Sequence, residues 1–424
     1  MMEHGIMPTQ RRRRLYATSL KCLDCGREHG LDEVVYTCPH CGGLLDVDYD
    51  YDRMGEEIDR KDLGTRRAHS IWRYSEFLPI DAGHAITLGE GFTPLAKAEA
   101  LGRSTGLRNL YLKLDFACPT GSFKDRGSSM MISKAKQIDV DTVAIDSSGN
   151  AAASIAGYSA KAGLRCYVFA PSYASAAKLV QSLAYGATVF AVEGSRGDTY
   201  ETARAAYQRF GWYYCGFQTN PYATEGVKTV AYEICEQFGW IPPDRIVIPV
   251  GTGGNLVGCW KGLKELHELG WIPRLPSLVC VQSEGCAPIS RAHRSGSKNI
   301  FPVERPRTVA EGLMITHPLK GKLVLKALSE SGGVAETVGD EEILQAGRLL
   351  ASREGVFVEP SAAVSVAGVV KLADSGSISE DETVVCVLTG SGLKTRDVYS
   401  EMVGRPVAIK PGMDDLEVMV HGRL

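Results

Sequence analysis

PTGSFKDRG, at residues 119–127, places one lysine, Lys124, in a short polar turn that two glycines flank. The preceding residues 110–114 alternate apolar and polar side chains as a half-buried strand does, and residues 128–132 resemble the start of a helix. We therefore expect Lys124 at a strand-to-helix junction. If the lysine is buried there, it loses its hydration shell, which lowers the pKa of the amine and lets it form a Schiff base. A lysine in a turn is more often a plain surface residue, so the interpretation depends on the segments around it.

Four other short segments accompany the lysine segment in the sequence. They are GEGFTPL at residues 89–95, SSGN at 147–150, GTGGN at 251–255 and LTGSGLK at 388–394. In this order, the five segments resemble the motifs of threonine synthases, which are pyridoxal 5'-phosphate (PLP) enzymes with the tryptophan synthase β-like fold. The resemblance extends from about residue 20 to about residue 400. It implies a two-lobed α/β protein of PLP fold type II, with parallel-type sheets covered by helices and with PLP bound covalently to Lys124.

Length and composition agree with a large globular protein. A chain of 424 residues exceeds what one hydrophobic core usually supports, so two or more lobes are expected. Apolar residues make up 44% and the net charge is −3, which argues against bulk binding to nucleic acids or membrane surfaces. The basic run at 11–14 lies in a polar segment without the apolar core of a signal peptide, and we expect residues 1–15 to be a disordered tail. Twelve cysteines without dense disulfide spacing indicate a cytoplasmic protein.

Residues 16–50 carry two CxxC pairs separated by twelve residues. This spacing is typical of a tetrahedral zinc site in a zinc ribbon, with the ligands Cys22, Cys25, Cys38 and Cys41. Four sulfur ligands leave no position for a substrate, so the metal would be structural. A ribbon that has lost its metal, or a pair of disulfides, are the alternatives.

From residue 142 onward, short apolar strands alternate with helices. Such a pattern predicts parallel sheets covered on both faces, with ligands at the carboxyl ends of the strands. We expect strands at 143–146, 166–169, 188–192, 245–250, 277–281 and 383–388, and helices near 150–162, 174–185, 198–210 and 255–268. The catalytic body is expected at 51–424. Within it, a small mobile lobe at about 128–215 is inserted in a large lobe formed by about 70–127 and 216–424.

The SSGN segment follows a predicted strand and opens a helix, where free backbone N–H groups favour an anion. The resemblance implies that Ser147, Ser148 and Gly149 bind the substrate carboxylate. It also gives Asn150 a hydrogen bond to the ring oxygen of the cofactor. A plain helix cap is the alternative, and one loop can serve both purposes.

The GTGGN segment follows a strongly apolar strand, and its glycines let the backbone close around a phosphate. It is neither the dinucleotide fingerprint nor a Walker loop, which disfavours NAD and nucleoside triphosphates. The resemblance makes this segment the binding site for the PLP phosphate, formed by Gly251, Thr252, Gly253, Gly254 and Asn255.

Thr389 ends the last predicted strand, and the resemblance places its hydroxyl on the pyridine nitrogen of PLP. A hydroxyl does not keep that nitrogen protonated as a carboxylate would, which suits elimination and replacement at the β and γ carbons of a substrate.

Binding of a substrate phosphate requires cations, and Lys178 and Arg196 are the candidates. Lys178 aligns with a lysine that threonine synthases carry in the same helix. Asp125 and Arg126, beside the central lysine, are expected to form a local ion pair that fixes the turn. Two positions depart from the family, because many threonine synthases have threonine at the position of Ala151 and histidine at that of Ser391. Both departures concern substrate selection more than PLP binding.

These observations favour a threonine synthase that converts O-phosphohomoserine and water to threonine and phosphate. A threonine or serine ammonia-lyase, or a β-replacing synthase resembling cysteine synthase, is the alternative on the same scaffold. A more distant alternative is a nucleic-acid-binding protein built around the zinc ribbon. The expected partners are a small phosphorylated amino acid and, by resemblance, a second copy of the chain in a homodimer, without nucleic acid or membrane.

Overall fold

The computed structural model describes residues 15–400, 403–413, 416 and 419–420, which fall into two units divided between Lys394 and Thr395. The second unit contains helix α15 (Arg396–Ser400). Except for Leu15, the predicted tail at 1–15, including its basic run, lies outside the described residues. The three sheets of the protein all belong to the first unit.

The N-terminal segment forms a small antiparallel sheet in the order β2-β1-β3. Its strands are β1 (Ala17–Cys22), β2 (Glu28–His29) and β3 (Leu45–Tyr49). In β1 and β3, alternating side chains such as Leu20 and Val47 are buried against the body of the protein. Helices α1 (Tyr51–Glu57) and α2 (Arg60–Leu63) follow this sheet.

A six-stranded sheet forms the centre of the unit, in the order β12-β11-β10-β13-β5-β4. Its strands are β4 (Leu95–Lys97), β5 (Asn109–Lys113), β10 (Arg245–Pro249), β11 (Ser277–Ser283), β12 (Val334–Val338) and β13 (Thr383–Val387). Five strands are parallel, as expected, but the edge strand β4 runs antiparallel to β5. The sequence pattern did not reveal β4, because a three-residue edge strand buries too little surface to show an apolar period.

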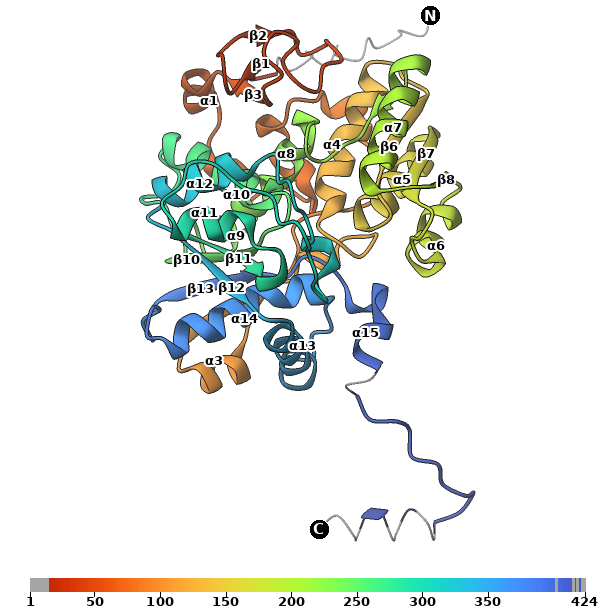
Figure 1. Cartoon of the computed structure of the whole chain (residues 1–424). Coiled ribbons are helices and arrows are strands. Elements are labelled where there is room, and N and C mark those ends of the chain that lie inside the picture. Colours follow the sequence, from red (N-terminus) through yellow and green to blue (C-terminus); the bar gives the residue numbers. More distant parts are fainter. Residues whose placement is uncertain (1–14, 401–402, 414–415, 417–418, 421–424) are drawn as a thin grey trace, which may run out of the picture. The chain divides into compact units, whose positions relative to one another are not determined.

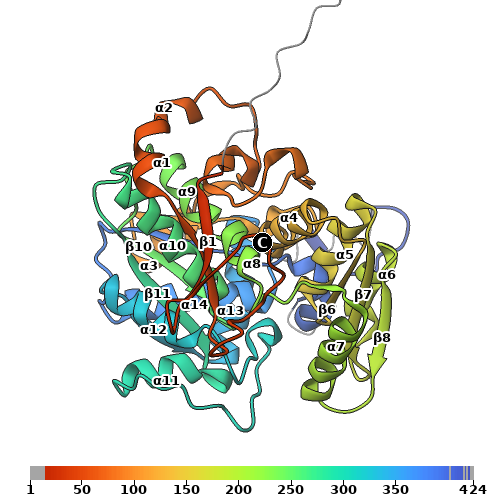
Figure 2. The ribbon, with the colours of Figure 1, turned by 90° about the horizontal axis from the view of Figure 1, so that it is seen from above.

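A second, four-stranded sheet is parallel throughout, in the order β8-β7-β6-β9. Its strands are β6 (Thr142–Asp146), β7 (Arg165–Pro171), β8 (Thr188–Val192) and β9 (Tyr213–Tyr214). Helices α5 (Asn150–Ala162), α6 (Ala176–Ala184) and α7 (Arg196–Phe210) accompany it, and Figures 1 and 2 both show this group beside the larger sheet. The predicted helix at 150–162 is confirmed, and α7 begins two residues early because Ser195 and Asp198 form a capping box.

The remaining helices pack on the six-stranded sheet or on one another. They are α3 (Glu99–Thr105), α4 (Lys124–Gln137), α8 (Pro221–Val227), α9 (Thr229–Gln237), α10 (Gly254–Glu268), α11 (Pro288–Arg294), α12 (Gly321–Glu330), α13 (Asp340–Glu354) and α14 (Pro360–Asp374). Short 3-10 helices lie at Ile71–Phe77, Ala82–His84, Asp115–Ala117, Glu284–Cys286, Glu311–Leu313 and Gly392–Lys394.

Strand β10 shows how the two faces of this sheet are filled. Ile246 and Ile248 belong to an apolar cluster with α9 and α10, whereas Val247 belongs to a cluster with α13 and α14. Figure 1 shows the two groups of helices on opposite faces of the sheet. Because both faces are covered, the strand is apolar at successive positions from Ile246 to Pro249 rather than at alternate ones. In the part of the chain that the structure describes, no helix is both long and apolar enough to cross a bilayer.

Candidate active site

Lys124 is the first residue of α4, so the helix begins four residues earlier than the sequence predicted. The carbonyl groups of Ser122 and Phe123 already accept hydrogen bonds from the N–H groups of residues 125 and 126, at 3.3 and 3.2 Å. The Nζ atom of Lys124 lies 4.5 Å from the ring centroids of both Phe123 and Phe217. Burial lowers the pKa of Lys124 to about 8, and the positive charge of Lys320 acts in the same direction. About a tenth of this amine is therefore neutral at pH 7, compared with less than about a thousandth for a lysine of ordinary pKa.

A pocket at Lys124 brings together four segments that are distant in the sequence. Its walls come from the start of α4, from α8, from the glycine turn before α10 and from the residue before α12. The lining residues are Phe123, Lys124, Phe217, Ala223, Thr224, Val227, Thr252, Gly254, Asn255 and Lys320. The predicted lysine and the predicted phosphate turn thus share one pocket.

The glycine turn has a backbone that other residues adopt poorly. Gly253 has a φ of +94°, and a Cβ atom there would lie 2.8 Å from a methyl group of Val324. At Gly251, a Cβ atom would lie 3.1 Å from a backbone carbonyl oxygen. Asn255 is buried, and neither polar atom of its side chain has a hydrogen-bond partner among the described residues. A buried amide without partners at the start of a long helix is suited to a polar ligand that completes its hydrogen bonds.

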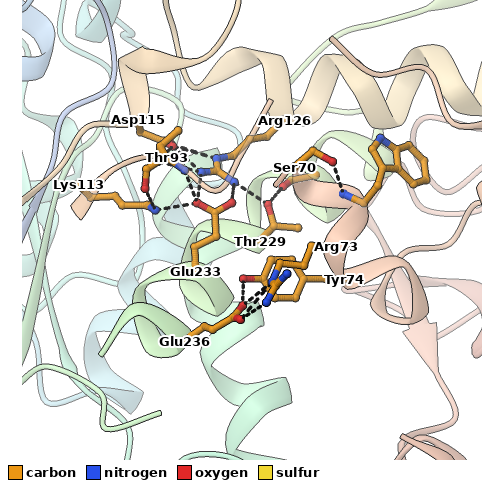
Figure 3. Close-up of polar contacts among 12 residues, drawn as sticks. Ser70, Arg73, Tyr74, Thr93, Lys113, Asp115, Arg126, Thr229, Glu233 and Glu236 are labelled. Atoms are coloured by element: carbon orange, nitrogen blue, oxygen red, sulfur yellow. Dashed lines mark hydrogen bonds and ion pairs between the residues drawn. The ribbon is translucent and has the colours of Figure 1, made fainter. Parts of the chain in front are cut away.

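Arg126 does not pair with its neighbour Asp125, so the predicted local ion pair is wrong. Its fully buried guanidinium donates to Asp115 at 2.6 Å and to Glu233 at 2.5 and 2.8 Å, and Lys113 reaches Glu233 at 2.7 Å (Figure 3). Burial alone would raise the pKa of Glu233, but the two cations hold it at about 2. The four groups form a neutral cluster that ties the start of α4 to β5 and α9.

Thr93, from the GEGFTPL segment, belongs to the same buried cluster. Its backbone N–H donates to Glu233 at 3.1 Å, and its hydroxyl donates to Asp115 at 3.1 Å. Its carbonyl oxygen accepts from Lys113 at 2.7 Å. The segment therefore contributes to the scaffold that holds the lysine helix.

The carboxylate of Asp125 contacts a different part of the protein from the guanidinium of Arg126. It accepts from the backbone N–H of Thr120 at 2.7 Å and from the hydroxyl of Ser154, on α5, at 2.6 Å. Burial raises the pKa of Asp125 to about 6, against the effect of these hydrogen bonds. This residue links the lysine segment to the helices of the four-stranded sheet.

The SSGN loop connects β6 to α5, as predicted. Gly149 occupies the N-cap position without a side-chain capping hydrogen bond, so capping by Ser147, Ser148 or Asn150 is not observed. Instead, the amide of Asn150 donates to both carboxylate oxygens of Glu359, at 3.0 and 3.1 Å. Glu359 is buried, which raises its pKa, and its negative charge raises the pKa of Lys124 against the larger effect of burial.

Thr389 is buried directly after β13, and its carbonyl oxygen accepts from the N–H of Phe123 at 2.9 Å. The next two residues continue this contact, since Gly390 forms a bridge to Ser122 and Ser391 donates its N–H to the carbonyl of Gly121 at 3.0 Å. The end of β13 is therefore bound to the turn that carries Lys124.

The two predicted phosphate-binding cations have other partners. Lys178, on α6, forms an ion pair with Glu311. Arg196 donates to the carbonyl and the carboxylate of Asp146, at 2.7 and 3.1 Å, at the end of β6. Neither lines the pocket at Lys124.

The four cysteines of the N-terminal segment form one cluster. The Sγ atoms of Cys22, Cys25, Cys38 and Cys41 all lie within 4.8 Å of one another, and all four are free thiols. The pairs 22/41 and 25/38 are 3.5 and 3.8 Å apart. Sulfur atoms bound to one tetrahedral zinc at about 2.3 Å have comparable separations. The four sulfur atoms therefore lie close enough together to surround one metal ion.

Known proteins resemble this chain over most of its length. A family model described as pyridoxal-phosphate dependent enzyme matches residues 86–390. Threonine synthase of Methanocaldococcus jannaschii is 40% identical over 399 residues, which cover 94% of this chain and 98% of that protein. Threonine synthase of Methanosarcina acetivorans is 42% identical over 405 residues, covering 95% and 99%. This chain belongs to the threonine synthase family.

The family membership makes the chain a PLP-dependent enzyme and confirms the predicted class of fold. Among solved structures, maize serine racemase superposes with a TM-score of 0.67 at 20% identity, covering 84% of this chain and all of that one. At this identity the similarity concerns the fold alone.

Sequence reasoning missed several residues at the site of this threonine synthase family member. Lys320, Phe217 and Thr224 line the pocket, and Glu359 binds Asn150. None of them lies in one of the glycine-containing segments. Two of the five segments, those at Lys124 and at the glycine turn, line the pocket, but they do not predict the residues that other parts of the chain contribute to it.

Proposed function

We propose that the chain is a threonine synthase, which converts O-phosphohomoserine and water to L-threonine and phosphate. Two threonine synthases that match 94% and 95% of it at 40% and 42% identity support this assignment. The observation that carries it is the pocket in which Lys124, with a lowered pKa, lies beside the glycine turn.

The residues of the pocket fit PLP. A lysine with a partly neutral amine can bind the aldehyde, and the turn before α10 offers N–H groups and an unpaired buried amide to a phosphate. When bound, PLP supplies an electron-withdrawing ring that stabilises negative charge on the substrate carbons. The proposed ligands of PLP are Lys124, Asn150, Gly251, Thr252, Gly253, Gly254, Asn255 and Thr389.

In this assignment Lys124 is also the residue that moves protons. An amine with a pKa near 8 can accept a proton from a substrate carbon and return it to another at neutral pH. The buried network around Arg126 holds the start of α4 in place, so that the Nζ atom keeps its position during these transfers.

The substrate carboxylate is proposed to bind at Ser147, Ser148 and Gly149, at the start of α5. Lys178 and Arg196 remain the proposed partners of the substrate phosphate, and each would have to leave its present carboxylate to reach it. We propose that Lys178 separates from Glu311 when a small lobe at about 128–215 moves against the rest of the body and excludes water. Arg196 and Asp146 both belong to this lobe, so a local rearrangement within it would free Arg196.

A structural zinc ion is proposed at the four cysteines, since their sulfur atoms have suitable separations. A cytoplasmic location and a homodimer are proposed as well. The twelve free thiols are compatible with a reducing compartment.

The decisive experiment measures products. Purified protein with PLP and O-phosphohomoserine should release phosphate and L-threonine in equal amounts, and Lys124→Ala should release neither. Formation of 2-oxobutanoate from threonine, with no phosphate release from O-phosphohomoserine, would identify an ammonia-lyase instead.

A further inference from the structure

Lys320 is a buried cation in the active-site pocket that the assignments above leave without a role. It directly precedes α12, and only 6% of its surface is exposed. Its Nζ atom donates a hydrogen bond of 2.6 Å to the hydroxyl of Thr224, and both residues line the pocket with Lys124. No carboxylate among the described residues lies within ion-pair distance of it.

The carboxylates whose charges act on Lys320 are already paired with another lysine. Asp46 and Glu225 act electrostatically on Lys320, but both form ion pairs of 2.7 Å with Lys261. Burial lowers the pKa of Lys320 to about 8. A buried ammonium group without a counter-ion is costly, and an anion in the same pocket removes that cost.

The backbone around Lys320 lies against the glycine turn. A Cβ atom on Gly253 would be 3.2 Å from the Cβ atom of Lys320 and 3.3 Å from its carbonyl oxygen. Asn255, the second residue of α10, contributes a buried amide without a partner among the described residues. A cation, an unpaired amide and the N-terminus of a fifteen-residue helix therefore line the same pocket.

We propose that Lys320 binds a phosphate monoester in this pocket, together with the glycine turn and Asn255. This inference rests on the proposed function, which brings two such phosphates to the site, one on the cofactor and one on the substrate. The contact between Lys320 and Gly253 favours the phosphate of the cofactor, since the turn is its proposed binding site. The positive charge of Lys320 would distinguish this site from one built on backbone N–H groups alone.

The test compares Lys320→Met with Lys320→Arg and with the control Lys326→Met. Lys326 lies on helix α12, which Lys320 directly precedes, and its side chain is 68% exposed and 3.7 Å from Glu330.

Each holoenzyme is dialysed to equilibrium against a series of PLP concentrations and, separately, of pyridoxal, which lacks the phosphate. Lys320→Met should weaken PLP binding by roughly tenfold to a hundredfold, as expected for the loss of a charge-assisted hydrogen bond, and should leave pyridoxal binding unchanged. Lys320→Arg should recover part of the loss, and Lys326→Met should bind both like the wild type.

A second arm tests the phosphate of the substrate at saturating PLP. If Lys320 binds that phosphate instead, Lys320→Met raises the KM for O-phosphohomoserine and the inhibition constant of inorganic phosphate, while PLP binding stays unchanged. The proposal is overturned if Lys320→Met changes PLP binding, substrate KM and phosphate inhibition by less than twofold. A wild-type protein that forms no threonine, but whose PLP affinity depends on Lys320, would refute the proposed function and leave this inference standing.

Discussion

Replacing Arg126 with methionine tests whether the buried charge cluster stabilises the start of α4. The guanidinium, Asp115, Glu233 and Lys113 are all fully buried, so Arg126→Met leaves two carboxylates opposite one ammonium group. A carboxyl pKa that falls from 4.5 to about 2, as for Glu233, corresponds to about 3 kcal/mol of folding free energy. Removal of one partner from a buried ion pair costs about 3–5 kcal/mol. We therefore expect Arg126→Met to lower the free energy of unfolding by about 3–5 kcal/mol at pH 7.

Urea denaturation followed by tryptophan fluorescence measures this loss, with Arg108→Met as the control. Arg108 also contacts two carboxylates, but its side chain is 63% exposed, so its loss should cost less than about 1 kcal/mol. The double variant Arg126→Met/Asp115→Asn restores neutrality around the remaining pair and should recover part of the stability.

The pH dependence of the loss separates charge from packing. In the wild type the folded pKa of Glu233 lies below its ordinary value, so its contribution is present above about pH 4.5 and is lost as pH falls towards 2. In Arg126→Met, burial favours the protonated carboxyl groups, so the difference from the wild type should shrink between pH 7 and pH 4. A loss below about 1 kcal/mol at pH 7, or one that is the same at both pH values, would refute the electrostatic argument.

Two further predictions concern the cysteine cluster and the lysine. Removal of the proposed zinc by a chelator should lower the urea concentration at the midpoint of unfolding, because metal binding contributes to folding. Metal analysis should find zinc in the purified wild type and in the control Cys235→Ala, but not in Cys25→Ser. The rate at which PLP becomes covalently attached to Lys124, followed by absorbance, should rise with pH and reach half its maximum near pH 8, because only the neutral amine reacts. A half-maximum above about pH 10 would mean that the pocket does not depress the pKa of this lysine.

The parallel sheets and the position of the pocket could be predicted from local sequence. Strands such as β10 and β13 are buried on both faces, so they appear as continuous apolar runs between turn residues. The lysine segment and the glycine turn are also local, because each functional group lies within a few residues of the glycines that shape its backbone. The two CxxC pairs are predictive for the same reason.

Lys320 and Glu359 could not be predicted in this way. Lys320 becomes buried because α8 and the turn before α10 pack around it, and its hydrogen-bond partner Thr224 lies 96 residues earlier in the chain. Glu359 accepts a hydrogen bond from Asn150, which lies 209 residues earlier in the chain. Single charged residues carry no periodic signal, so only the tertiary structure distinguishes them from the surface lysines and glutamates that the sequence also contains.

The incorrect ion pair between Asp125 and Arg126 has a geometric cause with a consequence for the site. Both residues belong to α4, where successive side chains point in directions about 100° apart and do not face each other. Asp125 therefore reaches Ser154 on α5, beside the four-stranded sheet, while Arg126 reaches Glu233 on α9, beside the six-stranded sheet. Lys124 directly precedes Asp125, so a movement of the proposed small lobe, which carries α5, would pull on the first turn of α4, while the cluster at Arg126 would resist it. If lobe closure leaves these contacts intact, the chain would bend elsewhere than at Lys124, and the amine would stay fixed as the proposed substrate-binding loop approaches it.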